Sequence, residues 1–191
     1  MSRRARTTGD DGVALLEAAI VFPVIMMVIL AVIEFGMLFS STSTTTSSTR
    51  DGARYATAFY AVRSDKVAVG DEIRATVERD LGALTGQGEP VRMWVYRATP
   101  ATGEPSGGVA CGSDCLRYTW DTSTNHFVYD ATSVPWSGLS VDACLPTLDE
   151  IGVMVEVRHD MLTGVIGSAP KTIRERTVLR LEPLPTSQCS T

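Results

Sequence analysis

The sequence predicts an α+β protein in which a long, membrane-spanning N-terminal α-helix is followed by a small head built on an antiparallel sheet. An apolar stretch, interrupted only by two acids, fills residues 13–39. Apolar residues recur every three to four positions over residues 71–84, which is the spacing of an amphipathic helix. From residue 91 onward the apolar period changes to two, as in strands with one buried face. Helices first and strands afterwards are typical of the α+β class.

Composition excludes two classes of protein. The chain has 191 residues, of which 44% are hydrophobic and 20% charged, so it has enough apolar residues to form a core. The net charge is −5 and the isoelectric point is near 5.0. No run of lysine and arginine extends beyond the extreme N-terminus. We therefore expect neither a disordered chain nor a nucleic-acid partner.

The apolar stretch carries an acid near each end and a proline between them. Glu17 and Glu34 are 17 helical steps apart, or about 25 Å at 1.5 Å per residue. The hydrocarbon core of a bilayer is about 30 Å thick, so the carboxylates fall near its two edges, where Glu34 is expected to reach water. Pro23 frees the carbonyl of Ala19 and predicts a bent or loosened turn.

The charges around this stretch predict its orientation. Arg3, Arg4 and Arg6 precede it, and the next basic residue is Arg50. The positive-inside rule therefore keeps the N-terminus in the cytoplasm and places the rest of the chain outside. The apolar run is longer than that of a cleaved signal peptide, and no clear small-x-small site follows it. We expect a single-pass protein of the cytoplasmic membrane.

Three separated segments carry a resemblance to a known family. They are "GVALLEAAIVFPVIMMVILAVIEFG" at residues 12–36, "TRDGARYA" at residues 49–56 and "RERTVLRLEP" at residues 174–183. In this order they resemble the TadE-like minor pilins or pseudopilins of bacterial tight-adherence (Flp-type, type IVb) pilus systems. The chain departs from the family pattern at Asp51, where glutamate is usual, and at Ala18, where some members have phenylalanine.

The resemblance implies a structural, pilin-like protein that assembles or initiates a pilus. Its expected partners are the membrane, other pilins, pilus assembly proteins and, if the leader is cleaved, a prepilin peptidase that cuts between Gly12 and Val13. Cleavage would give Val13 a new amino group, whose usual pKa of about 7.7–8.0 makes it a cation that can balance Glu17. By the same resemblance Glu17, Pro23 and Glu34 serve helix packing and assembly. The protein could remain in the envelope or enter a surface pilus.

Four parts are expected along the chain. Residues 1–12 form a basic leader, residues 13–39 a transmembrane helix, residues 40–63 its continuation outside the membrane, and residues 64–191 the α+β head. Ten consecutive serines and threonines at residues 40–49 have the composition of a linker. The apolar stretch before them, the helical spacing after them and the family resemblance favour a continuous helix.

The head is expected to contain one helix and five strands. The helix covers residues 71–84, with Asp71 and Glu72 in its first turn. The strands are expected at residues 91–98, 115–121, 126–130, 150–160 and 172–183. In the fourth strand Val153, Val155 and Val157 point inward and Met154, Glu156 and Arg158 outward.

An apolar segment joins the last two strands. Its large apolar residues are Met161, Leu162, Val165 and Ile166. They predict either part of the core or a hydrophobic patch for a partner or the membrane surface.

The four cysteines all follow the apolar stretch and would share one oxidising compartment. We favour a Cys111–Cys115 disulfide that closes a small loop and a Cys144–Cys189 disulfide that holds the C-terminal tail, with the two crossed pairings still open. A zinc site on Cys111 and Cys115 is the rival interpretation. Zinc needs reduced thiolates, so the same two cysteines cannot form a disulfide and bind zinc at once.

No catalytic motif is recognised. The chain has neither H-E-x-x-H nor G-x-S-x-G, and His159 with Asp160 is expected to be a surface pair. We therefore predict no enzyme activity, no cofactor, no metal and no small-molecule substrate. The alternative to a pilin is a single-pass, membrane-anchored extracytoplasmic binding module or adhesin, and an anchored hydrolase that uses His159 ranks third.

Overall fold

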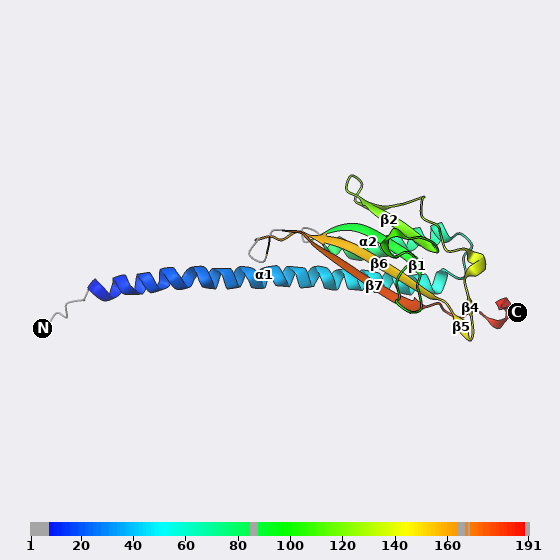
Figure 1. Cartoon of the computed structure of the whole chain (residues 1–191), viewed down its shortest axis with the longest axis horizontal. Coiled ribbons are helices and arrows are strands. Elements are labelled where there is room, and N and C mark those ends of the chain that lie inside the picture. Colours follow the sequence, from blue (N-terminus) through cyan, green and yellow to red (C-terminus); the bar gives the residue numbers. More distant parts are fainter. Residues whose placement is uncertain (1–7, 85–87, 164–166, 168, 190–191) are drawn as a thin grey trace.

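A computed structural model describes residues 8–84, 88–163, 167 and 169–189, and it shows a long helix that extends well beyond a small head (Figure 1). The arginines of the expected leader, and Val165 and Ile166, lie outside the described residues. The helices are α1 (Thr8–Phe59) and α2 (Lys66–Leu81). The main strands are β1 (Glu89–Arg97), β2 (Cys115–Asp121), β3 (His126–Tyr129), β6 (Glu150–His159) and β7 (Lys171–Arg180). Two short strands, β4 (Ala143–Cys144) and β5 (Thr147–Leu148), form a separate pair.

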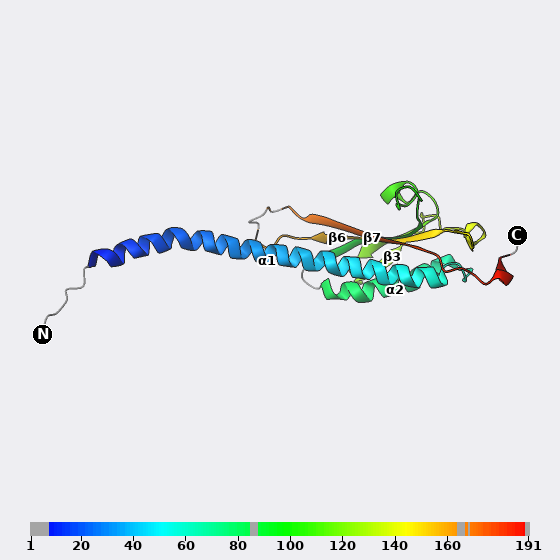
Figure 2. The same ribbon diagram turned by 90° about the horizontal axis from the view of Figure 1, so that it is seen from below.

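The head is an antiparallel sheet covered by helices on one face. The strand order is β3-β2-β1-β6-β7, and each neighbouring pair in this order is antiparallel. The second half of α1 and the whole of α2 lie on the same side of this sheet (Figure 2). This architecture confirms the predicted α+β class with a long N-terminal helix.

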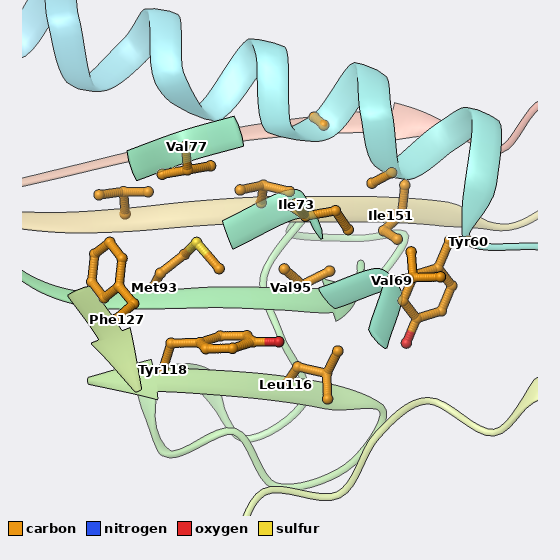
Figure 3. Packing of buried hydrophobic residues seen from close by; sticks show 14 of the residues in the cluster. Tyr60, Val69, Ile73, Val77, Met93, Val95, Leu116, Tyr118, Phe127 and Ile151 are labelled. Atoms are coloured by element: carbon orange, nitrogen blue, oxygen red, sulfur yellow. The ribbon is translucent and has the colours of Figure 1, made fainter. Parts of the chain in front are cut away.

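The main core lies between the helices and the inner face of the sheet. Val153, Val155 and Val157 of β6 point into it, as their alternation predicts. Met93 and Val95 of β1 lie on the same face, opposite α2 (Figure 3).

The outer face of the sheet is also partly buried, which the sequence did not predict. Trp94, Tyr96 and Met154 form a second cluster on this face together with the Cys111–Cys115 disulfide. The loop between β1 and β2 covers them: the Trp94 indole donates to the Val109 carbonyl at 3.1 Å. Met154 and Glu156 do lie on the outer face, as predicted, but each is only 4% exposed. The prediction of the face was correct, and the exposure that it implied was wrong because both faces of the sheet are covered.

Helix α2 begins five residues earlier than expected. Asp65 precedes its first residue, and the Asp65 carboxylate accepts a hydrogen bond from the backbone N–H of Ala68 at 3.0 Å. This is an N-cap, and it starts the helix at Lys66. Asp71 and Glu72 therefore lie within the helix, so their placement in its first turn was wrong.

Candidate functional site

The first half of α1 is apolar and exposed. Val13, Phe22 and Ile33 are among its many exposed large apolar side chains. The structure has one helix that is long and apolar enough to cross a membrane, within Gly12–Phe59 of the described residues. Figures 1 and 2 show that this half projects alone from one end of the head.

The residues expected to serve processing and assembly lie along this exposed half. Gly12, Val13, Glu17 and Pro23 are all exposed and helical, and α1 continues through Pro23. A side chain added at Gly12 would meet no other atom within 4 Å. Glu34 lies near the middle of α1, where the exposed half ends and the helix reaches the head, so the structure does not bring it together with Glu17.

The predicted exposure of Glu34 is wrong. The residue is 1% exposed, and its carboxylate accepts hydrogen bonds from the backbone N–H groups of Leu162 at 2.7 Å and Thr163 at 3.0 Å. The Thr163 hydroxyl donates a third at 2.6 Å. These donors come from the segment that follows β6, and they take the place of the water that the carboxylate was expected to reach. We call Glu34, Leu162 and Thr163 the loop junction.

His159 is also buried, so its predicted place on the surface is wrong. It is 1% exposed, and its Nδ1 lies 3.2 Å from the Ser41 hydroxyl of α1. Within the described part of the chain, its Nε2 has no hydrogen-bond partner. His159 is buried because it continues the inward face of β6 after Val157 and lies under α1. Asp160 is exposed, as expected, and its carboxylate pairs with Arg158.

One face of the hydroxyl-rich segment of α1, with Ser41, Thr45, Ser48 and Thr49, is buried against the sheet. The Thr45 hydroxyl donates to the Ser41 carbonyl at 2.8 Å, and the Ser48 hydroxyl donates to the Thr45 carbonyl at 2.8 Å. The Thr49 hydroxyl lies 3.0 Å from the Thr177 hydroxyl of β7, within hydrogen-bond distance. Hydroxyls bonded to their own helix need no water, and their small size lets α1 approach the sheet closely.

The "TRDGARYA" segment forms the contact between the two helices. A Cβ atom at Gly52 would lie 2.7 Å from the Val77 Cγ2 atom of α2, so a larger residue does not fit without displacement. Ala53 and Ala56 are fully buried on the same side of α1. The segment therefore has a clear packing role, and its glycine was the signal that could have revealed this crossing.

The end of α1 is stabilised by charged and polar side chains from the start of α2. The Lys66 ammonium donates to the carbonyls of Tyr60 and Arg63, and burial lowers the pKa of Lys66. The Tyr55 hydroxyl donates to the Glu72 carboxylate, and Arg63 pairs with the same carboxylate at 2.7 Å. The bond from Tyr55, followed by that from Arg63, lowers the pKa of Glu72.

The structure pairs the cysteines in the way that the sequence analysis favoured. Cys111 is bonded to Cys115, and Cys144 is bonded to Cys189. The first disulfide belongs to the outer-face cluster, and the second ties the C-terminal tail to β4. With both thiols of the C-x3-C pair in a disulfide, they are not the thiolates that zinc would require.

A hollow beside α2 in the head is large enough for a ligand. It has a volume of about 670 Å³ and lies between the end of α2 and the β2–β3 hairpin. Trp120, Glu78 and His126 line it, and the His126 Nδ1 lies 3.2 Å from a Glu78 carboxylate oxygen. Glu78 also accepts from the Phe127 backbone N–H at 2.6 Å, so it holds the hairpin against α2.

Comparison with known proteins identifies the N-terminal part of the chain. The family model for TadE-like proteins matches residues 12–54. The chain is TadE-like over this segment. The match confirms the resemblance and covers the exposed half of α1, Glu34 and Gly52. The TadE-like segment associates the chain with tight-adherence pili, and this family is structural and is not known for enzymes. No curated protein and no solved structure matches the chain.

Proposed function

We propose that this TadE-like chain is a minor pilin or pseudopilin that assembles or initiates a tight-adherence pilus. The first half of α1 spans the cytoplasmic membrane, with the N-terminus inside and the head outside. The observation that carries the proposal is the match to TadE-like proteins over a helix half whose large apolar side chains are exposed. Such a surface needs lipid or other apolar helices to cover it.

The cytoplasmic end of this half serves processing and assembly. At the inner end, a prepilin peptidase cuts between Gly12 and Val13, and the new amino group of Val13 balances the Glu17 carboxylate of its own or a neighbouring subunit. The exposure of Glu17 supports this, because a neighbouring chain can reach its side chain. The small residues Ala18 and Ala19 are also exposed, and they allow close approach of a second helix.

Mass spectrometry and mutagenesis test the proposal together. The chain extracted from membranes should begin at Val13. Glu17→Gln should abolish pilus assembly while the protein remains in the membrane, because the variant loses the charge but keeps the size of the side chain. Glu182→Gln, at an exposed acid in the head, is the matched control and should assemble normally. An intact leader together with normal pili in Glu17→Gln would reject the pilin role.

The alternative is a membrane-anchored binding module or adhesin in which α1 serves only as a tether. The hollow between α2 and the β2–β3 hairpin is the observation that favours it. In that case Trp120→Ala would abolish adhesion without changing assembly, and Glu17→Gln would have no effect on either.

A further inference from the structure

We propose that the base of the head is a second membrane contact, in which Leu162, Phe35 and Phe39 lie in the lipid interface and Glu34 holds the loop junction there. This inference rests on the membrane insertion of α1 that is part of the proposed function. In addition to the apolar half of α1, a surface of the head then contacts the bilayer. The partner is the boundary between lipid headgroups and acyl chains.

The position of Glu34 along α1 places the loop junction at the edge of the bilayer. Val13 and Glu34 are 21 helical steps apart, or about 32 Å at 1.5 Å per residue. This length matches a hydrocarbon core of about 30 Å. Glu34 therefore lies at the outer edge of the bilayer when Val13 lies at the inner edge. Because Leu162 and Thr163 are bonded to the Glu34 carboxylate, they lie at the same level.

The polar groups of the loop junction satisfy one another. An acid and two backbone N–H groups at the edge of the hydrocarbon would be costly if they had no partners. Here the three hydrogen bonds to Glu34 satisfy the carboxylate and both N–H groups at once. The junction thus hides its polar groups from lipid, while the Leu162 side chain, which makes none of these bonds, stays outside.

An exposed apolar surface surrounds the loop junction. Leu162, whose backbone N–H is bonded to Glu34, is 72% exposed, and Phe39, five residues after Glu34 in α1, is 75% exposed. Phe35, one helical turn before Phe39, lines the same hollow as Glu34 and Met161. Leucine and phenylalanine are typical of surfaces that bind at the membrane interface. This surface continues directly from the exposed half of α1, which itself requires lipid.

The position of the junction in the fold agrees with this level. The end of β6 and the start of β7 lie at the end of the head that faces the free half of α1 (Figure 1). Leu139 is fully exposed as well, but it follows Gly138, which lies near Lys66 at the far end of α1. Leu139 is therefore an exposed leucine of the same head that the bilayer cannot reach.

The consequence is a fixed orientation of the head. A single helix lets the head rotate about the helix axis and tilt with it. A second contact, on the side of α1 where the loop junction lies, sets which face of the head points away from the membrane. The outer face and the hollow beside the β2–β3 hairpin would then be presented in one direction to other pilus proteins.

Site-specific fluorescence tests this inference on the full chain. Single cysteine variants Leu162→Cys, Val28→Cys and Leu139→Cys are labelled with an environment-sensitive dye in the oxidised protein. They are then reconstituted in vesicles of phosphatidylethanolamine and phosphatidylglycerol. The probes at Val28 and Leu162 should be quenched by spin-labelled lipid and protected from iodide, and the probe at Leu139 should behave in the opposite way. If the Leu162 probe behaves like the Leu139 probe, the membrane contact is rejected.

The helix probe separates this inference from the proposed function. If the Val28 probe is itself open to iodide, α1 is not inserted and the proposed membrane anchoring fails. If Val28 is in lipid and Leu162 is in water, only the second contact fails.

Glu34→Ala tests the role of the acid. Removal of the carboxylate breaks all three hydrogen bonds of the loop junction, so docking of Leu162 and Thr163 on α1 should weaken by roughly tenfold or more. Lipid quenching of the Leu162 probe should fall, while that of the Val28 probe stays the same. Glu34→Gln keeps one carbonyl acceptor and should lie between the two. Unchanged quenching at Leu162 in Glu34→Ala would reject the role of Glu34.

Discussion

The two halves of α1 place polar and apolar side chains in opposite ways. The first half, residues 13–33, is apolar and exposed, and the half that enters the head is rich in serine and threonine and buried. Leu15 and Phe22 are mostly exposed, whereas Ser41 and Thr45 have no exposed surface. One continuous helix thus has its apolar half outside and much of its polar half inside.

The difference shows that each half is matched to a different solvent. The first half hides its backbone polar groups in the helix and offers only apolar side chains, which suits lipid. The second half adds the small residues Ala53 and Ala56 to the core, and the sheet and α2 supply most of the larger apolar side chains. Its buried hydroxyls have partners within the helix or in β6 and β7, so their burial costs little.

The largest expected difference between the two regions is their response to alkali. The head buries Tyr60, Tyr96 and Tyr118, and residues 13–39 contain no tyrosine. Burial raises the pKa of Tyr96 to about 12 and raises those of Tyr60 and Tyr118 as well. Unfolded tyrosines ionise near pH 10, so the stability that these phenols contribute is complete below pH 10 and is lost as the pH rises toward about 12.

For Tyr96 alone, the loss between pH 10 and 12 is about 3 kcal/mol, at about 1.4 kcal/mol per pH unit. In detergent, the near-ultraviolet circular dichroism of the head should disappear in this window together with a rise in tyrosinate absorbance. The helical signal of the first half of α1 should remain. Ionisation of all tyrosines near pH 10 with the head intact would contradict this prediction.

A matched pair of glycines tests the packing of the two halves. Gly52→Leu places a side chain where Val77 already lies, and overpacking of this kind costs about 1–3 kcal/mol. At Gly36 an added Cβ atom would meet no atom within 4 Å, so Gly36→Leu should leave the stability of the head unchanged. Urea denaturation in detergent measures both variants. Equal stability of the two would show that α1 and α2 do not pack as described.

The smallest expected effects come from the buried hydroxyls. Thr45→Val removes a hydroxyl whose only described bond is to its own helix, so the free energy of unfolding should change by less than about 1 kcal/mol. Thr49→Val also takes a partner from the Thr177 hydroxyl and should cost more, about 1–2 kcal/mol. The same denaturation series ranks the two variants. A larger loss of unfolding free energy in Thr45→Val than in Thr49→Val would show that the Thr45 hydroxyl contributes more than its bond to the Ser41 carbonyl.

Local patterns predicted much of the secondary structure. The strands β1, β2 and β6 lie within about two residues of the expected ranges, because a period of two is visible in any short window of sequence. The start of α2 was missed because Asp71 and Glu72 resemble a first turn, whereas the N-cap is Asp65. The Cys144–Cys189 disulfide was the favoured one of three pairings, and the structure contains it.

The sequence alone determined that the chain has an apolar helix of membrane length, with acids near its ends, and an α+β head after it. It determined this because length, charge and period are local properties. The tertiary structure decided where Glu34 and His159 lie. Their partners Leu162 and Ser41 are 128 and 118 residues away along the chain, and only the packing of β6 against α1 brings them together. Glu34, which in the sequence looks like a solvent-exposed residue at the membrane boundary, is therefore the hydrogen-bond acceptor that holds the segment after β6 against α1.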